Sequence, residues 1–446
     1  MTFKTIGDFV ELQRGTTYKS SLLGLPGPYL LGLGSIGRDG GFRDEKLKTY
    51  GGTSAEKILV HPGDIYVSLK DVTQNGDLLG AVAKVPLSIN VGRLTQDTVK
   101  LIFKNKIDEN YFYWVLRTPQ YRDYCRSHAT GTTNLGLARE DFFKFRIPEL
   151  TVNRSRIATV LNGIEKKIEA NLAINSTLES LAQILFKSWF INFEPVKAKI
   201  AVLDAGGSQE EATLAAMTAT SGKDADSLAV FEREYPEKYA ELKATAELFP
   251  STMQESELGD IPAGWSSQRM SNIATLHYGK ALKKTERIDG PYPVYGSGGV
   301  TGSHNGYLVE GPGIIVGRKG SIGTIYWEDG KFHPIDTVYY VATKEEIPLS
   351  YLYYLMKTLN LPSMNTDAAV PGLNRDNVYR LEVLKPTQSI LNKFDNHIAT
   401  IRNGIQKNNN TIVSLVGLRD TLLPKLLSGE IPLPEAEELA KEADYV

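Results

Sequence analysis

The chain has 446 residues, more than one hydrophobic core usually supports and enough for two to four domains. Hydrophobic residues make up 41% and charged residues 23% of the sequence, which excludes disordered and fibrous proteins. No apolar run is long enough to span a membrane, no secretory signal begins the chain, and Cys125 is its one cysteine. We therefore expect a cytoplasmic protein without a disulfide framework or a multi-cysteine zinc site.

The net charge of −2 conceals an uneven distribution of charge along the chain. Residues 201–260 carry 13 acidic and 4 basic side chains, and residues 431–446 carry 5 acidic and 1 basic, so the rest has a net charge of +11. One interpretation is that the acidic segments only improve solubility. The other is that two basic folded parts contact nucleic acid while the acidic segments stay away from it.

The chain contains two copies of one sequence unit. Residues 156–166 (RIATVLNGIEK) return as residues 397–407 (HIATIRNGIQK), at an offset of 241. Three shorter matches keep the same order: residues 96–99 with 335–338, residues 136–139 with 372–375, and residues 5–15 with 270–279. Four ordered matches with slightly drifting offsets indicate a duplication in which loops have gained and lost residues.

Each copy begins with a region rich in glycine, tyrosine and valine, over residues 1–150 and 261–386. Short apolar runs entered through turns, such as residues 61–69, indicate strands, and residues 109–117 and 349–359 indicate helices. We predict an α+β fold in which each region is a twisted β-sheet with a few helices.

A long amphipathic helix is predicted after each region, over residues 151–196 and 387–430. Its apolar positions are three and four residues apart, the a/d pattern of a coiled coil, and Asn171 and Asn408 are suited to fix the register of a helix pair. Pro424 should kink or end the second helix. The predicted seams are Ile157, Val160, Ile164, Lys167, Asn171, Ile174, Leu178, Leu181 and Leu185, and Ile398, Ile401, Ile405, Asn408, Ile412, Leu415, Arg419, Leu422 and Leu426.

We predict that the two helices form an antiparallel coiled coil, which would relate the copies by a pseudo-two-fold axis and return the C-terminus toward the N-terminus. The alternative is that each helix lies on its own domain. Residues 197–260 are predicted as an acidic linker with a short helical pattern over residues 231–248, and residues 431–446 as an acidic tail. Both are expected to be mobile or to face a partner.

The sequence contains no motif that indicates catalysis. Residues 32–37 (GLGSIG) have the spacing of a dinucleotide loop, but further glycines follow them where a helix is needed, and residues 317–323 (GRKGSIG) lack the P-loop spacing. The six histidines do not pair at metal-ligand spacing, no nucleophile elbow occurs, and the Pro-Pro motif of an amino-methyltransferase is missing. We expect no active site, cofactor or metal in this chain.

Two matching loop systems carry cationic and hydrogen-bonding side chains suited to DNA. Arg and Lys can bond guanine, Asn and Gln can bond adenine, and neighbouring glycines let the backbone approach phosphates. For each residue, a solvated loop side chain is the alternative; the better candidates recur in both copies, Lys70 with Arg318 and Lys319, and Arg139 with Arg375. The candidate DNA-binding residues are Lys70, Gln74, Asn75, Thr132, Asn134 and Arg139 in the first copy, and Lys283, Lys284, Ser297, His304, Arg318, Lys319, Asn374 and Arg375 in the second.

Three segments resemble the specificity subunits of type I restriction–modification systems. Residues 185–199 (LFKSWFINFEPVKAK) are similar to the segment that closes their central helix, residues 257–265 (ELGDIPAGW) to the start of their second recognition domain, and residues 418–431 (LRDTLLPKLLSGEI) to their C-terminal end. Together with the repeat order, the resemblance covers nearly the whole chain.

The resemblance implies a non-catalytic subunit whose two target-recognition domains each read half of a split sequence in double-stranded DNA. Its central helices would dock two methyltransferase (M) subunits, which bind S-adenosylmethionine and methylate adenine N6. Motor–nuclease (R) subunits that use ATP and Mg²⁺ would complete the complex, so the cofactors belong to the partner subunits.

The predicted seam supplies a spacing for such a reading mechanism. From Ile157 to Leu185 it would be roughly 42 Å long at ~1.5 Å per residue, and one turn of DNA advances ~34 Å. Two unlike domains held about one turn apart predict a bipartite, asymmetric target whose spacer follows the helix length. The alternatives are a two-domain coiled-coil adaptor that binds proteins, and an enzyme that uses the loop at Gly32.

Overall fold

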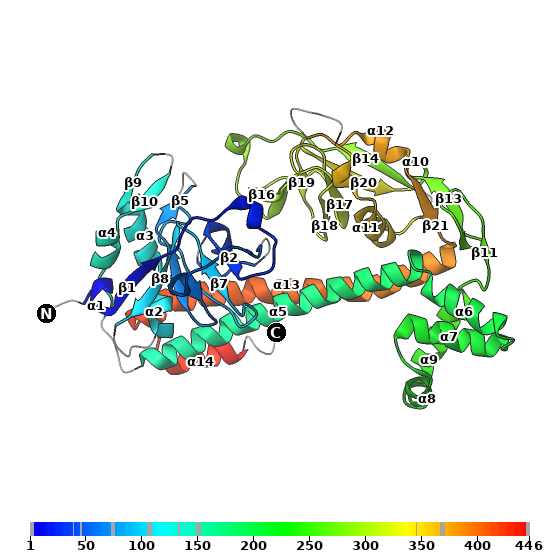
Figure 1. Cartoon of the computed structure of the whole chain (residues 1–446), viewed down its shortest axis with the longest axis horizontal. Helices are drawn as coiled ribbons and strands as arrows, with labels where there is room; N and C mark the ends of the chain where they lie inside the picture. Colours follow the sequence, from blue (N-terminus) through cyan, green and yellow to red (C-terminus); the bar gives the residue numbers. More distant parts are fainter. Residues whose placement is uncertain are drawn as a thin grey trace. The chain divides into compact units, whose positions relative to one another are not determined.

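The computed structural model describes residues 4–38, 40–44, 47–72, 76–104, 109–132, 134–148, 153–344, 346–365 and 371–442. The chain forms two compact units: unit 1 comprises Met1–Leu172 and Asn410–Val446, and unit 2 comprises Ala173–Asn409. Two long helices, α5 (Arg154–Phe190) and α13 (Gln388–Ser428), each contribute one part to either unit (Figure 1). Within the described ranges, no helix is both long and apolar enough to cross a membrane.

Unit 1 is organised around a four-stranded antiparallel sheet in the order β1–β8–β4–β6. Two further sheets of short strands have the orders β2–β7–β3 and β5–β10–β9. Helix α2 (Glu109–Val115) places Phe112 and Trp114 in the main core with β1, β4 and β8. The remaining elements are α1 (Ile6–Phe9), β1 (Val10–Arg14), β2 (Tyr29–Leu31), β3 (Leu59–Val60), β4 (Ile65–Ser68), β5 (Lys70–Asp71), β6 (Val82–Lys84), β7 (Gly92–Leu94), β8 (Thr98–Phe103), α3 (Pro119–Ser127), β9 (Ala129–Thr130), β10 (Leu135–Leu137) and α4 (Arg139–Lys144).

Unit 2 contains a sheet of the same kind, in the order β14–β20–β17–β18. Shorter sheets have the orders β16–β15–β19, β13–β21 and β11–β12. Helix α11 (Leu349–Thr358) buries Tyr351 and Tyr354 in the main core. The remaining elements of the sheet domain are β11 (Met253–Gln254), β12 (Ile261–Pro262), β13 (Ser266–Arg269), α10 (Met270–Ile273), β14 (Ala274–Tyr278), β15 (Tyr292–Gly296), β16 (Gly299–His304), β17 (Gly313–Gly317), β18 (Ile325–Glu328), β19 (His333–Pro334), β20 (Val338–Thr343), α12 (Arg375–Tyr379) and β21 (Glu382–Lys385).

The two main sheets share their strand order, which confirms that the chain contains two similar sheet-rich domains. The N–H groups of Gly15 and Gly279 donate to the carbonyls of Thr98 and Val338, at 3.1 and 3.2 Å. These bonds relate β8 to β20 by an offset of 240. The Asp-Thr-Val tripeptide that both copies contain had suggested an offset of 239. The sequence match is therefore shifted by one residue from the structural equivalence of the two strands.

Both copies need glycine directly after the first strand of the main sheet. A side-chain carbon at Gly15 would lie 2.2 Å from the carbonyl oxygen of Thr95, and one at Gly279 would lie 2.2 Å from that of Ile335. No other residue fits so close to backbone. The duplicated glycine therefore fixes the path of the chain next to residues 14 and 278.

In unit 1, the two long helices are joined by a half-buried carboxylate. Glu165 of α5 accepts hydrogen bonds from Arg419 of α13 at 2.9 Å and from Arg117, which follows α2, at 3.0 Å. Burial alone raises the pKa of Glu165, but the two guanidinium groups outweigh it and hold the pKa below its ordinary value.

In unit 2, Glu179 of α5 accepts from Arg402 of α13 at 3.0 Å and from Lys357 of α11 at 2.8 Å. The side-chain amide of Asn175 also accepts a hydrogen bond from Asn408 at 2.9 Å and donates one to Asn409 at 2.8 Å. Higher residue numbers on α5 thus face lower numbers on α13. The two helices run antiparallel, as predicted.

The predicted seam is correct for α13 and for the first half of α5, and wrong for the second half of α5. Ile174 and Leu181 are 49% and 51% exposed, whereas Phe186 and Trp189 are buried against the aromatic residues of α11 and α13. A straight helix drifts by about 20° per heptad, so a strict seven-residue repeat does not stay on one face. Asn171 is buried as predicted, but its amide donates within α5, to Lys167.

Of the two outcomes expected at Pro424, a kink or an end, the structure excludes the end, because α13 continues to Ser428. Proline removes one backbone hydrogen bond. Leu422, Leu423 and Leu426 are buried in the core of unit 1 on both sides of the proline, and this packing holds the segment helical.

The predicted linker contains four helices: α6 (Glu194–Asp204), α7 (Gln209–Ser221), α8 (Ala225–Glu234) and α9 (Pro236–Glu247) (Figure 1). Ser208 and Glu211 form a reciprocal cap at the start of α7, and Asp224 caps α8. Met217 and Leu228 are central to a small core that includes residues of α7, α8 and α9. The segment is a packed helical cluster, and the expectation of a mobile linker is corrected.

The acidic tail also folds, as α14 (Leu433–Glu442). Leu433 and Ala436 are buried in the core of unit 1, and Arg156 of α5 donates to both carboxylate oxygens of Glu437, at 2.9 and 3.0 Å. One carboxylate of the tail thus pairs with the basic start of α5, and the expectation of a mobile end is corrected for these residues.

We expect Glu165→Gln to destabilise the chain by roughly 2–4 kcal/mol at neutral pH, because it leaves two buried guanidinium groups without a carboxylate. Urea unfolding of the full chain measures this loss. Since the pKa of Glu165 is lowered in the folded state, the ion pair stabilises fully above its ordinary value of 4.5, and the difference between wild type and variant should shrink as the pH falls below it.

Glu169→Gln on the exposed surface of the same helix is the matched control and should change stability little. Equal destabilisation by both variants, or a difference that does not depend on pH, would contradict the role of the half-buried carboxylate.

Candidate functional site

Four of the predicted DNA-binding residues of unit 2 lie together. Arg318 and Lys319 follow β17, and Asn374 and Arg375 stand at the start of α12. All four line one pocket of about 250 Å³, together with Tyr278 at the end of β14 and four further residues: Tyr339, Gly372, Leu373 and Asp376. The lining contains three cationic side chains against one carboxylate, so the pocket favours an anionic or electron-rich ligand.

The guanidinium groups in the pocket are held by aromatic rings. The Cζ atoms of Arg318 and Arg375 lie 4.8 and 5.1 Å from the centre of the Tyr278 ring. Arg318 also donates through Nη1 to the carbonyl of Asp336 at 2.8 Å. The buried Nε of Arg375 has no hydrogen-bond partner within the described part of the chain. Arg318 is therefore oriented before any ligand arrives.

Tyr339 of β20 lines the pocket and contacts the loop before α12. Burial, with Tyr278 beside it, raises the pKa of Tyr339 against the opposing effect of Arg318, so the hydroxyl stays protonated at neutral pH. The hydroxyl donates to the carbonyl of Leu373 at 3.0 Å, and the N–H of Leu373 donates to the carbonyl of Arg318 at 2.8 Å. These bonds fix the two loops against each other.

The other candidates of unit 2 do not line this pocket. Lys283 and Lys284 are exposed at a short 3₁₀ helix, where Lys283 pairs with Glu286 at 3.5 Å. The carbonyl of Ser297 accepts from Thr324 at 2.7 Å, and Nδ1 of His304 accepts from the backbone N–H of Ile288 at 3.2 Å. In the structure Ser297 and His304 therefore support their own loops.

In unit 1, the candidates surround the small sheet β5–β10–β9. Lys70 in β5 pairs with Gly136 in β10, and its amine lies 3.5 Å from Asp97. Thr132 and Asn134 are exposed in the turn between β9 and β10. Arg139 begins α4 three residues after Gly136. Gln74 and Asn75 lie outside the described residues.

Of the residues predicted to recur, Lys319 is equivalent to Lys70 and Arg375 to Arg139, whereas Arg318 does not correspond to Lys70. Lys70 pairs with Gly136, and Lys319 forms the same antiparallel bridge with Gly372. Arg139 and Arg375 are each the first residue of the short helix that follows. Each guanidinium also lies over the aromatic ring four residues later, 5.3 Å from Phe143 and 5.7 Å from Tyr379.

Sequence reasoning missed Arg14 and Tyr278, which both precede the duplicated glycine. Arg14 donates through Nε to the carbonyl of Gln96 at 2.7 Å. In unit 2 the equivalent carbonyl, that of Asp336, receives the guanidinium of Arg318 instead. Both copies thus place a guanidinium on the equivalent carbonyl, from the end of β1 in unit 1 and from the residue after β17 in unit 2. The match of residues 5–15 with 270–279 aligned Arg14 with Tyr278. Because the two residue types differ, the alignment did not mark this position as functional.

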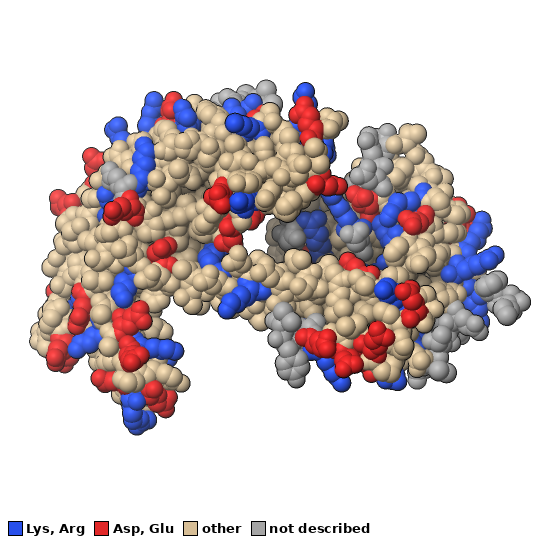
Figure 2. All heavy atoms as spheres, turned by 180° about the vertical axis from the view of Figure 1, so that it is seen from behind, with Lys and Arg blue, Asp and Glu red and all other residues tan. Residues whose placement is uncertain are grey.

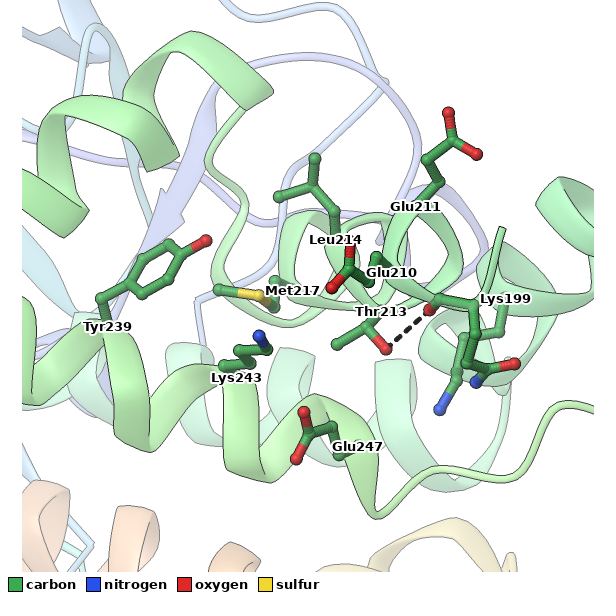
Figure 3. A pocket seen from close by; sticks show the side chains of 10 residues that line it. Lys199, Glu210, Glu211, Thr213, Leu214, Met217, Tyr239, Lys243 and Glu247 are labelled. Carbon is green, nitrogen blue, oxygen red and sulfur yellow. Dashed lines mark hydrogen bonds between the residues drawn. The ribbon is translucent and has the colours of Figure 1, made fainter. Parts of the chain in front are cut away.

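A second pocket lies within the helices of the former linker (Figure 3). It has a volume of about 620 Å³ and is lined by residues of α6, α7 and α9, including Lys199, Lys243 and Glu247. Burial lowers the pKa of Lys199, whose amine donates to the carbonyls of Ala246 and Phe249 at 3.3 and 2.7 Å. The amine of Lys199 is therefore occupied by the backbone, and no serine, cysteine or histidine lines this pocket.

Charged side chains of both signs are mixed on the surface. On the face drawn in Figure 2, Lys and Arg side chains are interspersed with Asp and Glu over both units. Among the described residues, no group of three His, Cys, Asp or Glu side chains could hold a metal ion. The loop sites around Lys70 and Lys319 are therefore the candidates that the geometry supports.

Known proteins with similar sequences share one function. Residues 262–410 match the family described as "Type I restriction modification DNA specificity domain". The chain is 29% identical over 307 residues to the type I restriction enzyme HindI specificity subunit of Haemophilus influenzae, an alignment that covers 62% of this chain and 67% of the relative. It is 23% identical over 363 residues to the MjaIX specificity subunit of Methanocaldococcus jannaschii, with 80% and 75% coverage.

The S subunit of a type I restriction–modification system from M. genitalium aligns over 95% of both chains, at 16% identity and a TM-score of 0.47. The matched stretch 262–410 begins in β12, contains the sheet domain of unit 2 and ends within α13. The sequence comparisons agree with the resemblance of the three segments described above. Residues 262–410 thus match the DNA specificity domain of type I restriction–modification systems, and the chain is similar over most of its length to specificity subunits of such systems.

Proposed function

We propose that this non-catalytic subunit reads a bipartite, asymmetric DNA target with two recognition domains, one in each unit. One observation carries the proposal: two domains of the same topology hold a lysine and an arginine at equivalent places beside unlike neighbours. Tyr278 and Arg318 of unit 2 stand where unit 1 has Arg14 and Leu69. A shared frame with different side chains suits two half-sites of different sequence.

Arg318 is the strongest candidate for base recognition in unit 2. An arginine that offers two N–H groups to guanine O6 and N7 is the commonest specific contact in the major groove. The Asp336 carbonyl and the Tyr278 ring hold Arg318 in one orientation, which reduces the entropy lost on binding.

The exposed apolar face of α5 supports docking of a methyltransferase subunit. Ile174, Leu181 and Ile184 are 49%, 51% and 63% exposed on this helix. A cluster of large apolar side chains on the surface marks a protein interface more often than chance. We infer that M subunits bind here and supply S-adenosylmethionine, while R subunits supply ATP-dependent cleavage. The same face also favours the second candidate function, an adaptor that binds only proteins.

The proposed function is tested by co-expressing the chain with its methyltransferase and mapping methylated adenines. We expect one bipartite motif with a fixed gap, because a single chain carries both recognition domains. Scattered methylation, or DNA retention that does not weaken with salt, would favour the protein adaptor.

In the same assay, Arg318→Ala should relax one half-site and leave the other unchanged. Loss of a bidentate contact costs roughly 1–3 kcal/mol of discrimination at the contacted base pair. Arg269→Ala, which breaks an exposed pair with Glu382 in the same unit, is the control and should leave the motif intact. Equal relaxation of both half-sites would mean that Arg318 contacts phosphate or serves the fold.

Leu181→Lys should weaken co-purification of the methyltransferase at least tenfold, because a charge would be buried in an apolar interface. Val230→Lys on α8 changes a residue of similar exposure (42%) away from this face and serves as the control. If both variants retain the methyltransferase equally well, the docking surface lies elsewhere.

A further inference from the structure

The two recognition sites differ in most side chains but share two cations. The residues next to these cations differ between the copies, and Leu69 of unit 1 corresponds to Arg318 of unit 2. The carbonyl of Leu69 accepts the N–H of Leu137 at 2.9 Å, and the carbonyl of Arg318 accepts the N–H of Leu373 at 2.8 Å. Lys70 and Lys319 follow these residues in the same bridge to glycine. The shared cations and the divergent residues are therefore adjacent in the chain.

The arginine of each pair is placed in the same way in both units. Arg139 and Arg375 lie over the ring four residues later, Phe143 or Tyr379, at 5.3 and 5.7 Å. An aromatic ring beneath a guanidinium holds the side chain while its N–H groups remain available to a ligand. In unit 2, the arginine and Lys319 line one pocket, so the two cations can reach a common ligand.

A purely structural reason for the recurrence does not fit the exposure of the lysines. The side chain of Lys70 is 51% exposed, and Lys319 is exposed and forms no ion pair with any described carboxylate. Lys70 lies 3.5 Å from Asp97, but an ion pair with this exposure contributes little and can be exchanged for another anion. What recurs is positive charge offered to solvent.

Two half-sites of different sequence have one chemical feature in common, the phosphate backbone. Phosphate contacts fix the register of a protein on DNA and carry no sequence information, whereas base contacts must differ between half-sites. Residues that a duplication keeps alike should therefore meet the phosphates, and residues that it changes should meet the bases.

We propose that Lys70 with Arg139, and Lys319 with Arg375, form a duplicated phosphate clamp. Each pair binds the backbone of one half-site, and base discrimination belongs to the positions where the copies differ, such as Arg318. This inference rests on the proposed function, that the two domains read DNA.

The test uses the complex of the full chain with its methyltransferase. Binding to a duplex with the complete target, and to one with both half-sites scrambled, is measured across a range of salt concentrations for wild type, Lys70→Gln, Lys319→Gln and the double variant. Each lost phosphate contact should reduce the slope of log affinity against log salt by about 1, on both duplexes. The ratio of affinities for the two duplexes and the methylated motif should not change.

Lys243→Gln on α9 is the matched control, since it removes an exposed lysine outside both sites and should leave the slope as in wild type. Lys319→Arg keeps the charge and should also retain the slope. Thermal melting of each variant shows whether the chain still folds, so that misfolding is observed separately from a lost phosphate contact.

The outcomes separate the clamp from the proposed function. If wild type methylates one bipartite motif but Lys70→Gln and Lys319→Gln keep its salt slope, or relax the base sequence of their own half-site, the clamp is wrong. If wild type shows neither a salt-dependent affinity for DNA nor a bipartite motif, the proposed function fails first. A reduced slope on both duplexes with an unchanged motif supports the clamp.

Discussion

The half-buried carboxylates of α5 make the interactions on which the arrangement of each unit depends, because each joins three elements at once. Glu165 bonds Arg419 of α13 and Arg117 after α2; Glu179 bonds Arg402 of α13 and Lys357 of α11. A carboxylate taken out of water is tolerated only when charged partners surround it. Pairing of the long helices and attachment of a sheet domain to them are therefore a single requirement in each unit.

The cations on the sheet domains are related by the repeat. Arg117 and Lys357 differ by the same offset of 240 that relates β8 to β20, and each contacts a tyrosine one turn earlier, Tyr113 or Tyr353. The long helices are not related in this way, because both carboxylates lie on α5 and both arginines on α13. At these two contacts the long helices are therefore complementary in charge, α5 supplying the carboxylates and α13 the guanidinium groups.

The sequence was sufficient to predict what repeats and what is periodic. Four ordered matches predicted the two domains, and recurrence selected Lys70 with Arg318 and Lys319, and Arg139 with Arg375. The backbone places Lys319 at the position of Lys70 and Arg375 at that of Arg139, whereas Arg318 corresponds to Leu69. The exposed face of the second half of α5 was not predictable, because Phe186 and Trp189 compete with the leucine pattern and the partner surface decides between them.

Two other features escaped prediction for different physical reasons. The helical cluster between the copies has a core built around few large apolar residues, among them Met217 and Leu228, so its composition resembled that of a solvated linker. Tyr278 and Tyr339 lie in strands, where tyrosine is common, and only the fold reveals that they hold the guanidinium groups of Arg318 and Arg375.

The backbone around each recognition site leaves the side chains free to change. Gly15 and Gly279 approach a carbonyl so closely that the chain can take only one path there, and that path is the same in both copies. Residue 14 is an arginine and residue 278 a tyrosine, yet a guanidinium reaches the equivalent carbonyl in each unit, at 2.7 and 2.8 Å. The backbone path is the same whether the guanidinium comes from the end of β1 or from the residue after β17. The residues that face a ligand can therefore be exchanged while the backbone of the domain stays the same. A backbone that keeps its path when these side chains change is what a protein needs if one fold is to read two different sequences.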